Sequence, residues 1–202
     1  LRMLPDVLDV TASLGSEISY DLLKEQGDFE YERYKDNLDK LINELSTDEA
    51  KENLETSLYG NWISTLKPLL SKKGKGYPMF MQNDAWAKKD IECFAGSYTE
   101  LKHDTVLYAK QVMAEMGGGD IPEYDDRGYV QPEPLVYERF KFLADETRGG
   151  LKDRGLLSSQ DEENLKRLSE LSKSLYDISI KELNDEVLSD EEYDFIREYG
   201  GT

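Results

Sequence analysis

Residues 159–178 of the chain read SQDEENLKRLSELSKSLYDI. Within this stretch an apolar side chain recurs every three or four positions, at Leu165, Leu168, Leu171, Leu175 and Ile178. This spacing places all of them on one face of a helix. Ser159 and Glu162 form the pattern of a capping box, in which two side chains satisfy backbone N–H groups of the first turn. The stretch therefore predicts a long amphipathic helix.

Helical signals of the same kind recur along the rest of the chain. Capping boxes begin at Ser46, Ser97 and Ser189, and Ser16 opens an apolar repeat that stops at Gly27. No stretch alternates apolar and polar residues for long enough to predict a strand of a sheet. We therefore expect one all-α domain over residues 1–202, a bundle of about eight helices with one long irregular loop at about 117–134.

The sequence also predicts a boundary between two helices and a weak point inside a third. The capping box at Ser97 predicts that one helix covers 84–94 and that a new helix runs from 97 to about 116. Gly149-Gly150 falls inside the helix expected at 135–154. Because glycine is a poor helix former, we expect a kink or weak point there.

Composition limits the classes of function. The chain has 43 acidic and 25 basic side chains and a formal charge of −18. Such a surface repels nucleic acid and anionic membranes, which proteins bind through Lys and Arg. Aromatic residues make up 10% of the chain, which favours a folded over a disordered protein. One Cys and one His exclude an internal disulfide, a Cys-based zinc ribbon and a two-His catalytic site.

The two ends of the sequence are typical of a piece of a longer protein. The chain starts at Leu1 directly in an apolar repeat and ends on Gly200-Gly201-Thr202, whereas natural termini are more often polar and frayed. The sequence contains neither a signal peptide nor a run of about 20 apolar residues. We expect a segment excised from a longer chain, for which the missing signal peptide says little about location.

Charge is unevenly distributed. Residues 1–59 hold 15 acidic and 6 basic side chains, whereas residues 60–89 hold one acid and six lysines, at 67, 72, 73, 75, 88 and 89. The simpler interpretation is a solvated region that offsets the acidic helices around it. The sharper one is a docking patch for an anionic ligand or another domain.

A polar stripe follows one side of the helix expected at 97–116. Placed at 100° intervals, the residues on this side are Glu100, His103, Asp104, Leu107, Tyr108, Lys110 and Gln111. An ordinary solvated face is one interpretation. The alternative is a site in which Asp104 and Glu100 orient His103 as a general base, or in which the three hold a metal ion. Against that alternative, Glu100 already has a structural role in its capping box, and a lone His is more often structural than catalytic.

The remaining candidates have simpler explanations. Cys93 is expected to be a small buried hydrophobe. The acidic residues Asp120, Glu123, Asp125 and Asp126 do not match a calcium loop and are expected to be solvated. Trp62 and Trp86, with Tyr59, Tyr77 and Phe80, are expected in the core, with a ligand groove as the alternative.

Several runs together carry a family resemblance. These are YGNW at 59–62, GYPMFMQ at 76–82, GSYTELKHDTVLYAKQ at 96–111, GYVQPEP at 128–134 and EYDFIREYGG at 192–201. The chain resembles the bacterial domain of unknown function 3160 family over nearly its whole length. Tyr98 stands where that family more often has Trp, and the acidic loop 120–126 also departs from its pattern, which weakens a calcium site further.

The resemblance implies an internal or C-terminal portion of a longer, exported or lipid-anchored protein, and it supplies no activity. We expect an extracellular or cell-envelope module without catalysis of its own. It would present a groove near residues 77–111, with Trp86, Tyr108, Lys110 and Gln111 as candidate ligand-binding residues. The alternative is part of a hydrolase with catalytic candidates His103, Asp104 and Glu100, and with Lys110 or Gln111 on the substrate.

No cofactor and no metal are expected. The expected partners are other domains of the same longer chain and a cell-envelope ligand, not nucleic acid. A membrane would be reached only through a lipid anchor outside this segment.

Overall fold

The structure, a computed structural model, describes residues 5–106 and 128–198. Within these ranges it is built from nine α-helices and short 3₁₀ turns, without a β-strand. The expected all-α array is confirmed. The helices are α1 (Val7–Ser13), α2 (Glu17–Glu25), α3 (Tyr34–Leu45), α4 (Asp48–Leu54), α5 (Leu58–Leu66), α6 (Asp84–Val106), α7 (Pro134–Asp153), α8 (Ser159–Leu183) and α9 (Asp190–Glu198). The 3₁₀ turns are η1 (Asp28–Glu30), η2 (Lys67–Leu70) and η3 (Met79–Met81).

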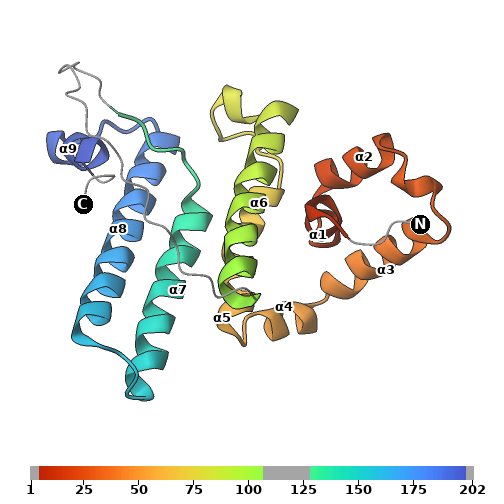
Figure 1. Ribbon diagram of the computed structural model, residues 1–202. Helices are drawn as coiled ribbons and strands as arrows, with labels where there is room; N and C mark the ends of the chain where they lie inside the picture. Colours follow the sequence, from red (N-terminus) through yellow and green to blue (C-terminus); the bar gives the residue numbers. More distant parts are fainter. Residues whose placement is uncertain (1–4, 107–127, 199–202) are drawn as a thin grey trace, which may run out of the picture.

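The helices form an extended array rather than a closed bundle (Figure 1). α7 and α8 make a hairpin and the most extensive contact between two elements, while α5 packs on α7 and η2 packs on α6. The small helices α1–α3 lie on the far side of α6 from this hairpin. No helix in the described ranges is both long enough and apolar enough to cross a bilayer.

Three separate apolar cores hold the array together. The central core joins α2, η2 and α6 and is formed by Ile18, Leu66, Leu69, Leu70, Ala87, Ile91 and Phe94. A second core lies among α1–α3 around Ala12, Leu23 and Leu38. The third joins α8, α9 and the segment before α7 around Val130, Ile178, Leu188 and Ile196. No single core spans the described residues, which is why the shape is an array.

The predicted capping residues are confirmed at two helices and shifted by one position at two others. Ser16 accepts a hydrogen bond from the Ser19 N–H at 3.3 Å, and Ser189 and Glu192 form the expected reciprocal box. The caps of the other two helices are Thr47 and Ser158, one residue after Ser46 and one before Ser159. A serine or threonine on either side of the helix start fits the same pattern, which explains the shift.

The predicted break before Ser97 is wrong, because α6 runs without interruption from Asp84 to Val106. The Ser97 side chain instead contacts another helix. Its Oγ accepts a hydrogen bond at 2.9 Å from the indole Nε1 of Trp62 in α5. The capping pattern therefore occurs inside a helix, where the serine side chain hydrogen-bonds to another helix instead of capping its own.

The predicted weak point at Gly149-Gly150 is also wrong, because both glycines lie inside α7. The extensive packing of α7 on α8 outweighs a glycine penalty of about 1 kcal/mol per residue. Of the irregular loop expected at 117–134, residues 128–133 are non-helical and α7 begins at Pro134. Residues 117–127 lie outside the described ranges.

The prediction that Cys93 is buried is wrong, because the thiol is exposed. The inward positions of α6 are Ala87, Asp90, Ile91 and Phe94, at helical spacing. Cys93 lies one residue before Phe94 and therefore points to another side of the helix. The apolar neighbours of Cys93 in sequence are not its neighbours in space.

This neighbouring pair gives a matched stability test. Phe94 is fully buried in the central core, so Phe94→Ala is expected to lower the free energy of unfolding by about 3–5 kcal/mol. The exposed Cys93→Ser is expected to change it by no more than about 0.5 kcal/mol. Urea unfolding followed by circular dichroism measures both. Equal losses would contradict this placement of the two side chains.

Candidate functional site

The residues predicted as ligand or catalytic groups are not all in one place. At about 1.5 Å per residue, the uninterrupted α6 separates Trp86 from His103 by roughly 25 Å along its axis. Glu100 is exposed and His103 is half-buried. The Asp104 side chain lies outside the described residues, as do Tyr108, Lys110, Gln111 and the acidic loop 120–126. Trp86 therefore belongs to a different region from the predicted polar stripe.

The described side chains contain no group of three or more His, Cys, Asp or Glu residues that could hold a metal ion. The trio of Glu100, His103 and Asp104 is not covered by this finding, because it includes a side chain outside the described set. That trio stays a prediction.

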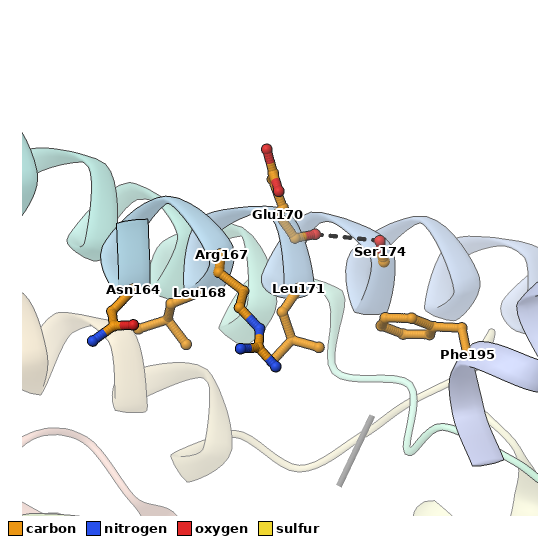
Figure 2. Close-up of a pocket in the computed structure, with 7 residues that line it drawn as sticks. All are labelled: Asn164, Arg167, Leu168, Glu170, Leu171, Ser174 and Phe195. Atoms are coloured by element: carbon orange, nitrogen blue, oxygen red, sulfur yellow. Dashed lines mark hydrogen bonds between the residues drawn. The ribbon is translucent and has the colours of Figure 1, made fainter. Parts of the chain in front are cut away.

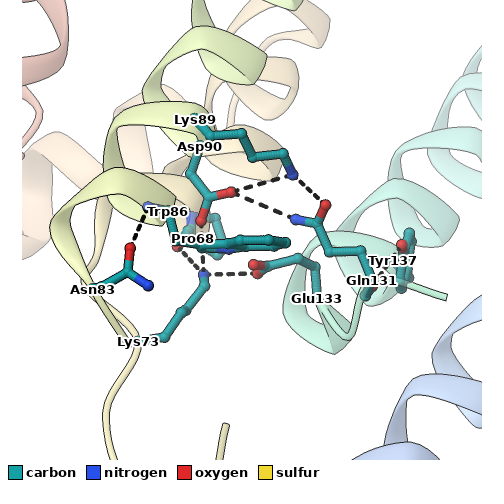
Figure 3. Close-up of polar contacts among 9 residues, drawn as sticks. All are labelled: Pro68, Lys73, Asn83, Trp86, Lys89, Asp90, Gln131, Glu133 and Tyr137. Carbon is teal, nitrogen blue, oxygen red and sulfur yellow. Dashed lines mark hydrogen bonds and ion pairs between the residues drawn. The ribbon is translucent and has the colours of Figure 1, made fainter. Parts of the chain in front are cut away.

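Around the N-terminal half of α6 lies a buried cluster of charges that the sequence analysis did not single out as a site (Figure 3). Three of its side chains are almost fully buried, with exposed fractions of 5% for Lys73, 1% for Asp90 and 6% for Glu133. The Lys73 Nζ lies 2.7 Å from Glu133 Oε2 and 3.9 Å from Asp90 Oδ2. Lys73 also donates a hydrogen bond to the Pro68 carbonyl at 3.1 Å. The Lys73 ammonium group thus forms ion pairs with two buried carboxylates.

Two further side chains close the cluster on the other side of Asp90. The Lys89 Nζ lies 3.7 Å from Asp90 Oδ1 and donates a hydrogen bond to Gln131 Oε1. The Gln131 amide donates in turn to Asp90 Oδ1 at 3.5 Å, and its backbone carbonyl accepts from the Tyr137 hydroxyl at 2.9 Å. We call Lys73, Lys89, Asp90, Gln131 and Glu133 the charge cluster.

The charge cluster fastens residues 128–133 to the helices on either side. Gln131 and Glu133 tie this segment to α6 and to the loop that carries Lys73. On the opposite side, the Val130 N–H donates at 3.0 Å to Glu182 Oε1 of α8. A segment without helical hydrogen bonds is thereby held in place by buried carboxylates on both sides.

Burial sets the electrostatics of the cluster. It raises the pKa of the Asp90 carboxyl, an effect that Lys73 and Lys89 oppose. It likewise raises the pKa of Glu133, against the hydrogen bond and charge of Lys73. The Glu182 carboxyl has a raised pKa for the same reason, against its hydrogen bond from Val130. Desolvation thus exceeds the local attraction at all three carboxylates.

Four buried polar atoms of this region make no hydrogen bond within the described part of the chain. They are Asp90 Oδ2, Glu133 Oε1, Glu182 Oε2 and the indole Nε1 of Trp86. An unsatisfied buried polar atom costs about 1–3 kcal/mol, so the arrangement is not optimised for stability alone. Buried ion pairs with such a cost are kept in some proteins because they fix one conformation.

An exposed aromatic surface lies next to the charge cluster. The Phe80 ring meets Trp86 and Tyr129 edge-on, with centroid distances of 5.2 Å and 6.2 Å. Phe80 is 50% exposed, Tyr129 52% and Met79 89%. The Lys89 Nζ lies 4.5 Å from the centre of the Trp86 ring and connects this surface to the charge cluster. We call Met79, Phe80, Trp86 and Tyr129 the aromatic patch.

Hydrogen bonds hold the turn that carries Met79 and Phe80. Asn83 donates to the Phe80 carbonyl at 2.8 Å, and its Oδ1 caps α6 by accepting from the Trp86 N–H at 2.9 Å. The Gln82 side chain donates to the Tyr77 carbonyl at 2.6 Å. The buried side chain of Met81, only 1% exposed, anchors the turn to the interior. The side chains of Met79 and Phe80 are therefore held outward by a fixed backbone.

A separate groove lies along α8, and its residues come later in the sequence than those of the charge cluster (Figure 2). Its volume is about 430 Å³, and it is open to solvent. Leu168, Leu171 and Phe195 supply its apolar walls, with Asn164 and Arg167 at one end. The Glu170 carboxylate points to the other side of α8. The groove offers apolar contact and one guanidinium, without a converging acid and base.

The lysine-rich region 60–89 was the signal in the sequence for this site. Lys73 turns inward while Lys72, Lys75 and Lys88 are exposed, so neither a solvated region nor a docking patch describes all six lysines. Asp90, Gln131 and Glu133 carry no local motif. Their meeting depends on how residues 128–133 pack on α6, which no spacing rule gives.

The sequence profile of a family described as protein of unknown function (DUF3160) matches residues 1–202. The chain belongs to this family. Neither the curated proteins nor the solved structures include a match to it.

The buried lysine gives a pH-dependent prediction. Because burial raises the pKa of Asp90 and Glu133, the native state keeps their protons to higher pH than the unfolded chain, and stability falls as pH rises through that interval. Lys73→Met removes the cation that opposes this rise. It is expected to lower the free energy of unfolding by about 3–5 kcal/mol at about pH 7, and by less at about pH 5, because a larger fraction of the two carboxyls carries a proton at the lower pH.

The adjacent exposed lysine provides the control. Lys72 pairs with Asp84 at 3.0 Å on the surface, so Lys72→Met is expected to change the free energy of unfolding little at either pH. Urea denaturation of both variants at the two pH values makes the comparison. A Lys73→Met loss that stays the same at both pH values would show that the carboxylates are not its cause.

Proposed function

We propose that the chain is a non-catalytic binding module of a longer exported protein, and that its aromatic patch contacts a component of the cell envelope. The observation that carries the proposal is the exposed, hydrogen-bonded turn at Met79 and Phe80. Large apolar side chains held in water on a fixed backbone are typical of binding surfaces.

The location is inferred from the family resemblance alone. Under this proposal the chain works outside the cell or at its envelope, where a lipid anchor and the other domains of the protein belong to segments beyond these residues. The charge of −18 argues against nucleic acid and against direct adhesion to an anionic membrane.

The hydrolase alternative has less support. Glu100, one of its carboxylates, is exposed, and α6 puts Trp86 roughly 25 Å from His103. The region where buried polar groups do converge is the charge cluster. There the ammonium of Lys73 already occupies the carboxylates, which favours a positioning role over proton transfer.

Co-sedimentation with purified bacterial cell walls and with membranes tests this proposal. The chain is expected to sediment with one of these fractions, and Phe80→Ala is expected to weaken binding at least about fivefold, as for an aromatic residue at the centre of an interface. Circular dichroism establishes that the variant is folded. Leu156→Ala is the matched control, because Leu156 is 69% exposed and lies between α7 and α8.

Two outcomes would overturn the proposal. One is an absence of binding to every envelope fraction. The other is binding that Phe80→Ala and Leu156→Ala affect equally.

A further inference from the structure

We propose that the aromatic patch docks an acidic segment of a partner protein, one that also presents apolar side chains. This inference rests on the proposed binding function and adds the chemistry of the partner. It follows from the shape of the turn, the charge around it and the kind of side chains exposed.

The apolar half of the argument is the turn itself. Met79 is 89% exposed, and the Phe80 ring is fixed between Trp86 and Tyr129. Because the backbone is already ordered by the hydrogen bonds of Asn83, little conformational entropy is lost when a partner covers these side chains. Methionine is flexible and polarizable, which suits contacts with apolar side chains of another protein.

The charged half of the argument is the contrast with the rest of the chain. Residues 60–89 carry six lysines against one acid, whereas the whole chain has a charge of −18. Lys89 lies over the Trp86 ring with its side chain 39% exposed, and the exposed Lys75 lies in the loop that leads to η3. Lys72 and Lys88 lie beside Asp84 on another side of α6. That side is about one helix diameter from the side that carries Trp86 and Lys89.

This contrast selects both the sign of the partner and the place where it docks. An acidic partner is repelled by the acid-rich helices and attracted where lysines outnumber acids, as in residues 60–89, so its approach is directed to the aromatic patch. The same acid-rich surface attracts a basic partner elsewhere and gives it no reason to choose the patch.

The side chains exposed at the patch favour a protein over an anionic polysaccharide. The rings of Phe80 and Tyr129 are inclined at 68°, so they do not form a flat platform for a sugar ring. Met79, the most exposed apolar residue of the patch, offers hydroxyl groups only a weak thioether acceptor. Its natural contact is an apolar side chain, with carboxylates beside it for the lysines.

The test uses the full chain carrying Trp62→Phe, which leaves Trp86 as the only tryptophan. Three probes are titrated while the Trp86 fluorescence is followed: a random copolymer of glutamate and leucine, poly-glutamate, and polygalacturonate. The copolymer is expected to bind at least about tenfold more tightly than poly-glutamate, because only the copolymer supplies apolar contacts. Polygalacturonate is expected to bind no better than poly-glutamate.

Surface variants locate the binding. Met79→Ser is expected to weaken binding of the copolymer about tenfold, and Lys75→Glu by a similar factor. Their matched controls are Val187→Ser, at a valine 87% exposed before α9, and Lys166→Glu, at an exposed lysine of α8. Neither control is expected to change the affinity. All four positions are exposed, so the variants are expected to fold normally.

Three results would overturn the inference: a copolymer that does not bind, tighter binding of polygalacturonate, or copolymer binding that Met79→Ser leaves unchanged. If cell walls still bind through Phe80 in any of these cases, the proposed function stands and only the partner class is wrong. If the copolymer binds as expected and envelope fractions do not, the partner class stands and the envelope target is wrong.

Discussion

The contact between Lys73 and two buried carboxylates holds together parts of the chain that are far apart in sequence. Asp90 lies on α6 and Glu133 immediately precedes α7, and the Lys73 Nζ reaches both, at 3.9 Å and 2.7 Å. On the α6 side residues 128–133 are held by this ammonium group and by Gln131, and on the α8 side by the packing of Val130 and its hydrogen bond to Glu182. The aromatic patch depends on these contacts as well, because Tyr129 belongs to that segment and Trp86 to the turn of α6 that carries Asp90. Buried charges thus help to position the aromatic patch, at some cost in stability.

The sequence was sufficient for the fold class because that class depends on local rules. Apolar spacing and caps such as Ser16 and Ser189 act within one or two turns of chain, so they predict helices directly. The same rules failed where tertiary contacts compete with them. Ser97 hydrogen-bonds to Trp62, and α8 supports α7 through Gly149-Gly150.

The candidate site was less predictable, for a physical reason. Trp86 and the lysines were visible as residue types, yet the partners of Lys73 come from positions 17 and 60 residues further along the chain. Such pairs are chosen by packing, and a carboxylate destined for burial has no distinguishing neighbours in sequence. Asp90 has the periodicity of an inward position on α6, but a charged residue at such a position is usually assigned to the surface.

The division of the interior into three small cores affects how the molecule opens. α1–α3 enclose Ala12, Leu23 and Leu38, while the hairpin end has its own core around Ile178 and Ile196. Because Ile18 of α2 also packs in the central core, the N-terminal helices share part of their interior with α6, whereas the hairpin end buries a core of its own, and the local openings of the two ends are expected to differ in free energy. Unfolding of such an array need not be a single all-or-none event, and amide exchange would then differ from one end to the other.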